Sequence, residues 1–136
     1  MIKPKVGVVS CSGECCSLGT LSRIATRRVL EDLKAGETVT ICLPLFLAGD
    51  SGERMFARQF PTVAVDGCHK LCATKAIEKY SGKTAATVDV ESMLEEHGQN
   101  PPASRRLLTP EDMATVDSVA GAIAEKVDVI KGAQDA

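Results

Sequence analysis

Val-Gly-Val-Val-Ser-Cys, at residues 6–11, is the stretch that decides the fold of this chain. A short apolar run without alternation is typical of a strand that is buried on both faces of a parallel sheet. Residues 20–34 follow with apolar side chains at helical spacing, and Gly36 stands where a helix cap is expected. Together, this strand and this helix predict the first half of a βαβ unit.

The same alternation continues along the chain. We expect further strands at 38–43, 62–65 and 84–90, and helices at 53–59 and 69–79. Strands that alternate with helices in this way indicate a mainly parallel sheet with helices on both faces. The sequence therefore predicts a three-layer α/β fold with four strands in the order 2-1-3-4.

The C-terminal part predicts a linker and one more helix. Residues 93–108 are polar and contain Pro101-Pro102, whereas 109–131 begins with Thr109 as N-cap and Pro110 at the first helical position. We expect the apolar stripe of this helix to pack on a single domain, 1–136, and it also offers a surface for a homodimer. Its members are Met113, Val116, Ala120, Ile123, Val127 and Ile130.

Composition excludes several classes of protein. The net charge of −2, with one Tyr, three Phe and no Trp, gives neither a basic footprint nor stacking groups for nucleic acid. The longest apolar stretch, 41–48, is far shorter than the roughly 20 residues that span a bilayer, and no signal-peptide core is visible. We therefore expect a cytoplasmic protein, in which six cysteines are reduced and serve metal or redox chemistry rather than disulfides.

The cysteines follow the predicted strands. Cys11 follows the first, Cys42 ends the second and Cys68 follows the third, so all three are expected at the carboxyl edge of the sheet, where ligands bind. Cys72 comes four residues after Cys68, and on a helix the two would share a face. Four converging thiolates suit tetrahedral zinc or an iron–sulfur cluster.

Other residues near these cysteines have more than one reading. Cys15 and Cys16 can reach the same place as additional or alternative ligands, and Cys42 can instead be a small buried apolar side chain. His69 can replace a cysteine as ligand, donate a hydrogen bond to one, or face solvent. Asp66 caps the following helix or bonds to the metal-binding loop.

Three stretches resemble a known family. They are Val-Ser-Cys-Ser-Gly-Glu at 9–14, Ile-Cys-Leu at 41–43 and Val-Asp-Gly-Cys-His-Lys-Leu-Cys at 65–72. Over residues 5–92 the chain is similar to the zinc-binding DGC-domain proteins, which are named for a central Asp-Gly-Cys. The resemblance implies that the metal-chelating positions are Cys11, Cys42, Cys68 and Cys72; the positions of Cys15 and Cys16 are usually not cysteine in that family.

These observations leave two main hypotheses for function. In the first, the four cysteines close the shell of one Zn²⁺, which would be structural, regulatory or stored. In the second, an iron–sulfur cluster performs redox or sulfur-transfer chemistry on a protein partner or small-molecule substrate. A metal-free thiol sensor is a third reading. A cysteine phosphatase is excluded because Ser17 stands where its anion-binding arginine would be. No catalytic residue is assigned.

Overall fold

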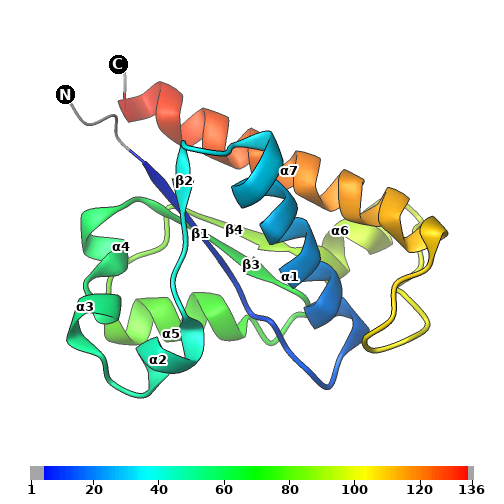
Figure 1. Cartoon of the computed structure of the whole chain (residues 1–136), viewed down its shortest axis with the longest axis horizontal. Helices are drawn as coiled ribbons and strands as arrows, with labels where there is room; N and C mark the ends of the chain where they lie inside the picture. The colour runs from blue at the N-terminus through cyan, green and yellow to red at the C-terminus, as the bar shows by residue number, and fades with distance from the viewer. Residues whose placement is uncertain (1–4, 135–136) are drawn as a thin grey trace.

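Four parallel strands form the centre of the structure, a computed structural model that describes residues 5–134. They are β1 (Val6–Ser10), β2 (Thr38–Val39), β3 (Thr62–Asp66) and β4 (Ala86–Asp89), in the order β2-β1-β3-β4. The register pairs Val8 with Val63 across β1 and β3, and Val65 with Val88 across β3 and β4. The predicted fold class and strand order are confirmed (Figure 1).

Helices cover both faces of this sheet (Figure 1). One face carries α1 (Ser17–Arg28) and the long α7 (Pro110–Gln134), and the other carries α4 (Phe56–Gln59) and α5 (Cys72–Tyr80). Three short helices complete the chain: α2 (Leu43–Leu47), α3 (Ser51–Arg54) and α6 (Val90–Glu96). Two helical layers around a parallel sheet leave the carboxyl ends of the strands as the open edge.

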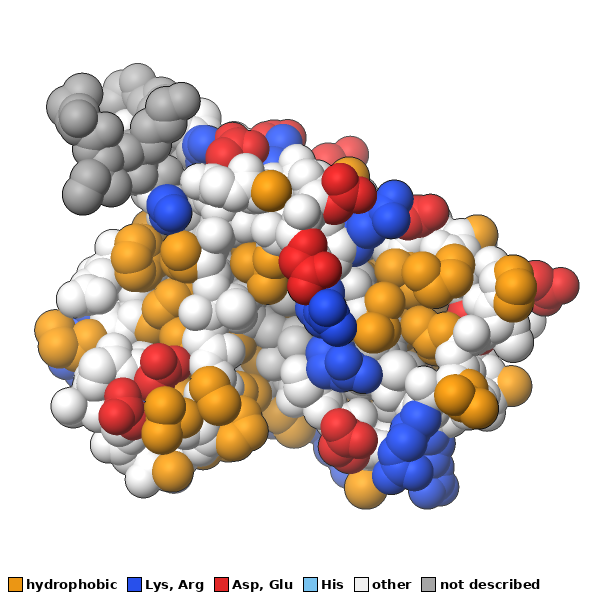
Figure 2. All heavy atoms as spheres, in the orientation of Figure 1, with side chains coloured by type: hydrophobic (Ala, Val, Ile, Leu, Met, Phe, Trp, Pro, Cys, Tyr) orange, Lys and Arg blue, Asp and Glu red, His pale blue; other side chains and the backbone are white. Residues whose placement is uncertain are grey.

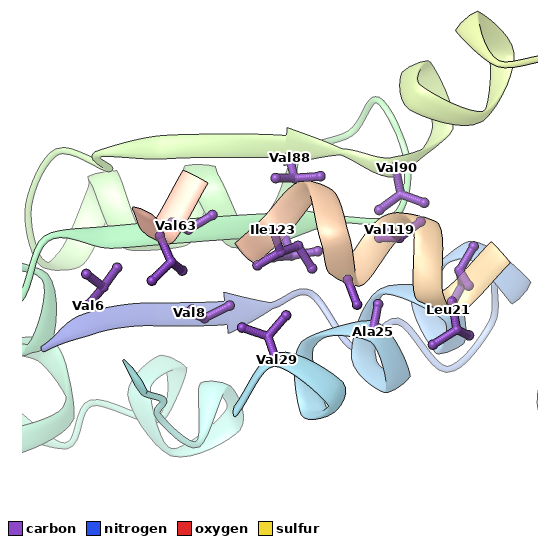
Figure 3. Close-up of a cluster of buried hydrophobic side chains, with 14 of the residues drawn as sticks. Val6, Val8, Leu21, Ala25, Val29, Val63, Val88, Val90, Val119 and Ile123 are labelled. Atoms are coloured by element: carbon purple, nitrogen blue, oxygen red, sulfur yellow. The ribbon is translucent and has the colours of Figure 1, made fainter. Parts of the chain in front are cut away.

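The alternation of side chains along each strand separates two cores. Val8 and Val63 point to the α1 and α7 face, where Ile123 packs against them, whereas Val9 and Ala64 belong to a smaller cluster on the other face. Figure 3 shows side chains of β1, β3, α1 and α7 that converge on the larger cluster. The two central strands, β1 and β3, are thus buried on both sides, as their continuous apolar sequence predicts.

The C-terminal helix begins as predicted. The Thr109 amide donates to the Asp112 carboxylate at 2.7 Å, and the Asp112 amide donates to Thr109 Oγ1 at 3.2 Å, a reciprocal cap. The apolar stripe packs on the domain, although its first member, Met113, is 40% exposed. The fully buried part of the helix comprises Val116, Val119, Ala120, Ile123 and Val127.

Several boundaries differ from the sequence prediction. The helix expected over 20–34 begins at Ser17, and after Arg28 it widens into a π-helical turn, Val29–Leu33. The helix expected over 53–59 is divided into α3 and α4 at Met55. The strand expected over 84–90 ends at Asp89, and the helix α6 extends into the linker expected over 93–108; Asp89 caps this helix by accepting the Ser92 amide at 3.1 Å. Among residues 5–134, no helix has both the length and the hydropathy needed to cross a membrane.

Candidate metal centre

All six cysteines lie in loops or helix starts at the carboxyl edge, and all are free thiols. Cys11 directly follows β1, Cys15 and Cys16 precede α1, and Cys68 comes two residues after β3. Figure 1 shows the chain leaving β1 and β3 at the same end of the sheet. Cys11, Cys16 and Cys68 are partly buried, whereas Cys15, Cys42 and Cys72 are exposed.

Two cysteines lie in local structure that differs from the prediction. Cys42 does not end a strand, because β2 stops at Val39; Cys42 instead precedes α2, and its amide donates to Glu53 Oε2 at 3.1 Å. Cys68 and Cys72 do not share a helix face, because α5 begins only at Cys72. Leu71, with φ of 54°, is in the left-handed region and separates the two cysteines by a turn.

Cys11 is the cysteine with the most defined surroundings. The Gly67 amide donates to Cys11 Sγ at 3.3 Å, and Ser22 Oγ lies 3.4 Å from the same sulfur. These contacts come from two different elements, the loop after β3 and helix α1. They bring the loop that carries Cys11 into direct contact with the loop that carries Cys68.

An apolar cluster also relates Cys11 to the other two loops. Cys11 packs against the core cluster on the α5 face, which includes Ala73, the residue after Cys72. Ile41 and Leu43, on either side of Cys42, belong to the same cluster. Three of the four predicted ligands, Cys11, Cys42 and Cys72, are therefore in or next to residues of one core cluster. Within residues 5–134, however, no three cysteine sulfurs lie within 4.8 Å of one another.

Asp66 fixes the start of α5. Its carboxylate is 1% exposed and accepts hydrogen bonds from the Ala73 amide at 2.7 Å, the Thr74 amide at 3.1 Å and Thr74 Oγ1 at 2.7 Å. A carboxylate at this position satisfies the free amides of the first helical turn and interacts favourably with the helix dipole. The prediction that Asp66 caps the following helix is confirmed.

Gly67 allows α1 to approach the end of β3. A Cβ at this position would lie 2.7 Å from the backbone carbonyl carbon and oxygen of Leu18. Atoms at that distance overlap, so any larger residue would push α1 away from the sheet. The Gly67 carbonyl also accepts the Glu91 amide at 3.1 Å, which ties this loop to the start of α6.

His69 is surrounded by carboxylates. Its Nδ1 lies 2.9 Å from Asp89 Oδ2, and its Nε2 lies 3.5 Å from Glu91 Oε2 and 3.6 Å from Glu95 Oε1. The hydrogen bond to Asp89 raises the pKa of His69 above its usual value of 6.5, with smaller contributions from the charges of the two glutamates. Partial burial raises the pKa of Asp89, but hydrogen bonds from His69 and Ser92 outweigh it and leave that pKa lowered.

The comparison with protein families identifies the family of this chain. The sequence model of the DGC domain matches residues 7–120. The chain belongs to the DGC-domain family. The match extends beyond residue 92, where the resemblance in sequence was expected to end, and takes in α6 and the first part of α7. The comparisons with curated proteins and with solved structures gave no match.

The Asp-Gly-Cys motif gives the DGC domain its name, and its first two residues have different structural roles. Asp66 holds α5 and Gly67 admits α1, while the Gly67 amide contacts Cys11. The chain then leaves the sheet at the carboxyl edge, where Cys68 lies. The motif is therefore the junction at which the elements around the site of this DGC domain meet.

Sequence reasoning missed some residues of this edge. Glu91 and Glu95 were not selected because α6 was not expected, although their spacing of four residues and the Asp89–Ser92 cap are signals of a short helix. The exposed apolar side chains beside Cys42 were also missed: Leu45, Leu47 and Met55 are 45%, 49% and 46% exposed. Figure 2 shows hydrophobic side chains on the surface where Figure 1 places α2 and α3.

Proposed function

We propose that this DGC domain is a cytoplasmic zinc-binding protein, in which Cys11, Cys42, Cys68 and Cys72 bind one Zn²⁺ at the carboxyl edge of the sheet. The observation that carries the proposal is the contact between the Gly67 amide and Cys11 Sγ, since it joins the first and third cysteine loops. Six free thiols in one small domain suit a reducing compartment.

The donor set suits zinc. Four thiolates are soft ligands that favour a tetrahedral ion, and when bound the Zn²⁺ would neutralise part of their charge and cross-link their loops. Cys42 and Cys72 are exposed, and each stands at the start of a helix, α2 or α5.

A shell of four protein ligands leaves no position for a substrate, so the proposed role is structural, regulatory or storage. The site lies at an exposed edge, where a partner protein or a small molecule can reach it. Both cores are built almost entirely from apolar side chains other than the cysteines, so we expect chelation to lower the free energy of unfolding without unfolding the protein.

The experiment is metal analysis of protein that is purified without oxygen and without an affinity tag. We expect one zinc per chain and no visible colour. Cys42→Ser should lower zinc affinity, and Cys68→Ser/Cys72→Ser should abolish stoichiometric binding, whereas the matched control Cys15→Ser should retain one zinc per chain. Full zinc occupancy in the Cys68/Cys72 variant would contradict the proposal.

One observation favours a second function, that of an iron–sulfur protein. Cys16 is a partly buried thiol at the N-cap of α1, so the loop after Cys11 brings further thiols to the same edge. Three or four of these thiolates can hold a cluster with redox or sulfur-transfer chemistry. Brown protein that contains iron and acid-labile sulfide would decide for this function, and loss of the colour in Cys16→Ser would identify the extra ligand.

A further inference from the structure

Three side chains at the carboxyl edge bring metal-ligating atoms together without any cysteine. The ligand atoms of His69, Glu91 and Glu95 all lie within 4.8 Å of one another, and no other trio of His, Cys, Asp or Glu in residues 5–134 does so. We propose that these three residues form a second cation site, which binds a divalent transition metal such as Mn²⁺ or Zn²⁺ through one imidazole nitrogen and two carboxylate oxygens.

The fold builds this arrangement from two neighbouring strands. Asp66 pairs with Asp89 in the register of β3 and β4, so the residues that follow each strand emerge side by side. Glu91 and Glu95 are one helical turn apart on α6 and therefore share a face. The His69 amide donates to Glu91 Oε2 at 3.0 Å, which holds the loop against that face.

The distances fit a common ion. A metal at about 2.0–2.2 Å from each of its nitrogen and oxygen ligands separates two tetrahedral ligand atoms by roughly 3.4 Å. His69 Nε2 lies 3.5 Å from Glu91 Oε2 and 3.6 Å from Glu95 Oε1. Small side-chain rotations suffice to place one ion between the three atoms.

The orientation of the imidazole also fits. Its Nδ1 lies 2.9 Å from Asp89 Oδ2, and Asp89 is held in turn by the Ser92 amide and hydroxyl, each at 3.1 Å. A metal-ligating histidine usually donates its other ring nitrogen to a carboxylate in this way, which fixes the tautomer and directs the free lone pair at the metal. Here Nε2 is the ring nitrogen that faces the two glutamates.

The charge of the cluster favours a cation. Three carboxylates surround one imidazole, and within residues 5–134 neither Glu91 nor Glu95 lies within ion-pair distance of a lysine or arginine. A divalent ion would offset the excess negative charge at a partly exposed position, where three protein ligands leave coordination positions for water or a substrate oxygen.

Mn²⁺ alone is the probe that separates this site from the thiolates, because Mn²⁺ prefers carboxylate and other oxygen ligands to thiolate. The experiment measures Mn²⁺ binding by the loss of the free-ion electron paramagnetic resonance signal. We expect Glu95→Gln and His69→Gln each to weaken binding by at least about tenfold. Glu95 is 67% exposed, so its substitution leaves the fold intact.

Two matched controls lie on or next to α6. Glu96→Gln and His97→Gln replace exposed residues of the same types outside the trio and should leave Mn²⁺ affinity unchanged. His69 and His97 are the two histidines of the chain, so substoichiometric Mn²⁺ should broaden the imidazole resonances of the ligand His69 at a lower metal-to-protein ratio than those of His97.

Several results would overturn the proposal. They are wild-type protein that does not bind Mn²⁺, unchanged affinity in Glu95→Gln, and equal broadening of both histidines. The Cys68→Ser/Cys72→Ser protein tests independence from the proposed zinc site: it should lose zinc and retain Mn²⁺. Loss of Mn²⁺ together with zinc in that variant would show that there is one shared site and would overturn the second site.

Discussion

We expect Asp66→Asn, which replaces one carboxylate oxygen by an amide NH₂ group, to destabilise the protein strongly. Both oxygens of the buried carboxylate are used: Oδ1 accepts the Ala73 amide, and Oδ2 accepts the amide and hydroxyl of Thr74. Asparagine offers one oxygen, so its amide nitrogen must face at least one backbone N–H of α5. The substitution also removes the negative charge at the start of that helix.

The magnitude follows from these contacts. A hydrogen bond to a charged group contributes about 1.5–3 kcal/mol, and a buried donor left without an acceptor costs a similar amount. Because Asp66 is 1% exposed, water cannot replace the lost acceptor. We expect the free energy of unfolding to fall by about 2–4 kcal/mol, out of about 5–15 kcal/mol for a typical domain.

Urea denaturation followed by circular dichroism measures this loss, with the denaturant slope as a check that the two-state comparison holds. The matched control is Asp50→Asn, which makes the same substitution at the exposed N-cap of α3, where one bond from the Glu53 amide is accepted at 2.9 Å. Asparagine and aspartate are equally good N-caps, so the control should change stability by less than about 0.5 kcal/mol. A loss below about 1 kcal/mol for Asp66→Asn, no larger than that of the control, would refute the reasoning.

Three further predictions concern the core, the close contact and the histidine. Ile123→Ala should lower the free energy of unfolding by about 2–5 kcal/mol in urea denaturation, because the side chain is fully buried. Gly67→Ala should lower the free energy of unfolding by about 1–3 kcal/mol, because its Cβ would overlap the backbone of Leu18. An unchanged free energy of unfolding would show that α1 can move freely. An NMR titration should place the pKa of His69 above 6.5, and Asp89→Asn should lower it. The ion pair should stabilise the fold at pH values below the unfolded-state pKa, and its contribution should be lost as the pH rises through the folded-state pKa.

The fold could be predicted from sequence wherever local pattern and global topology require the same thing. The apolar runs at Val6–Ser10 and Thr62–Asp66 are buried on both faces, and the right-handed βαβ rule then leaves few strand orders. Residues 38–43 have equally good strand residues, but only Thr38–Val39 pairs, because this edge strand has one neighbour and the chain then turns toward α2. Propensity alone could not show where that pairing ends.

Prediction of the site was limited because it depends on the same kind of long-range contact, which local sequence patterns do not show. That Cys11 and Cys68 lie at one edge follows from strand topology alone, and the structure brings their loops into contact. The expected helical relation of Cys68 to Cys72 was wrong, because Leu71 adopts a left-handed conformation that no local pattern indicated. The close approach of α1 to Gly67 depends on residues 48 or more positions apart in the chain, and a single sequence does not report such a distance.

The structure gives a physical reason for aspartate and glycine to precede cysteine at the end of β3. The aspartate orders the helix that begins with Cys72, and the glycine admits the helix that follows Cys11, so the two residues determine how the loops on either side of Cys68 are placed. The Gly67 carbonyl, through the Glu91 amide, extends the same junction to α6 and to the carboxylates around His69. A change at Asp66 or Gly67 should therefore disturb both the loops that carry the cysteines and the trio of His69, Glu91 and Glu95. A change at an exposed residue such as Glu95 should disturb the trio alone.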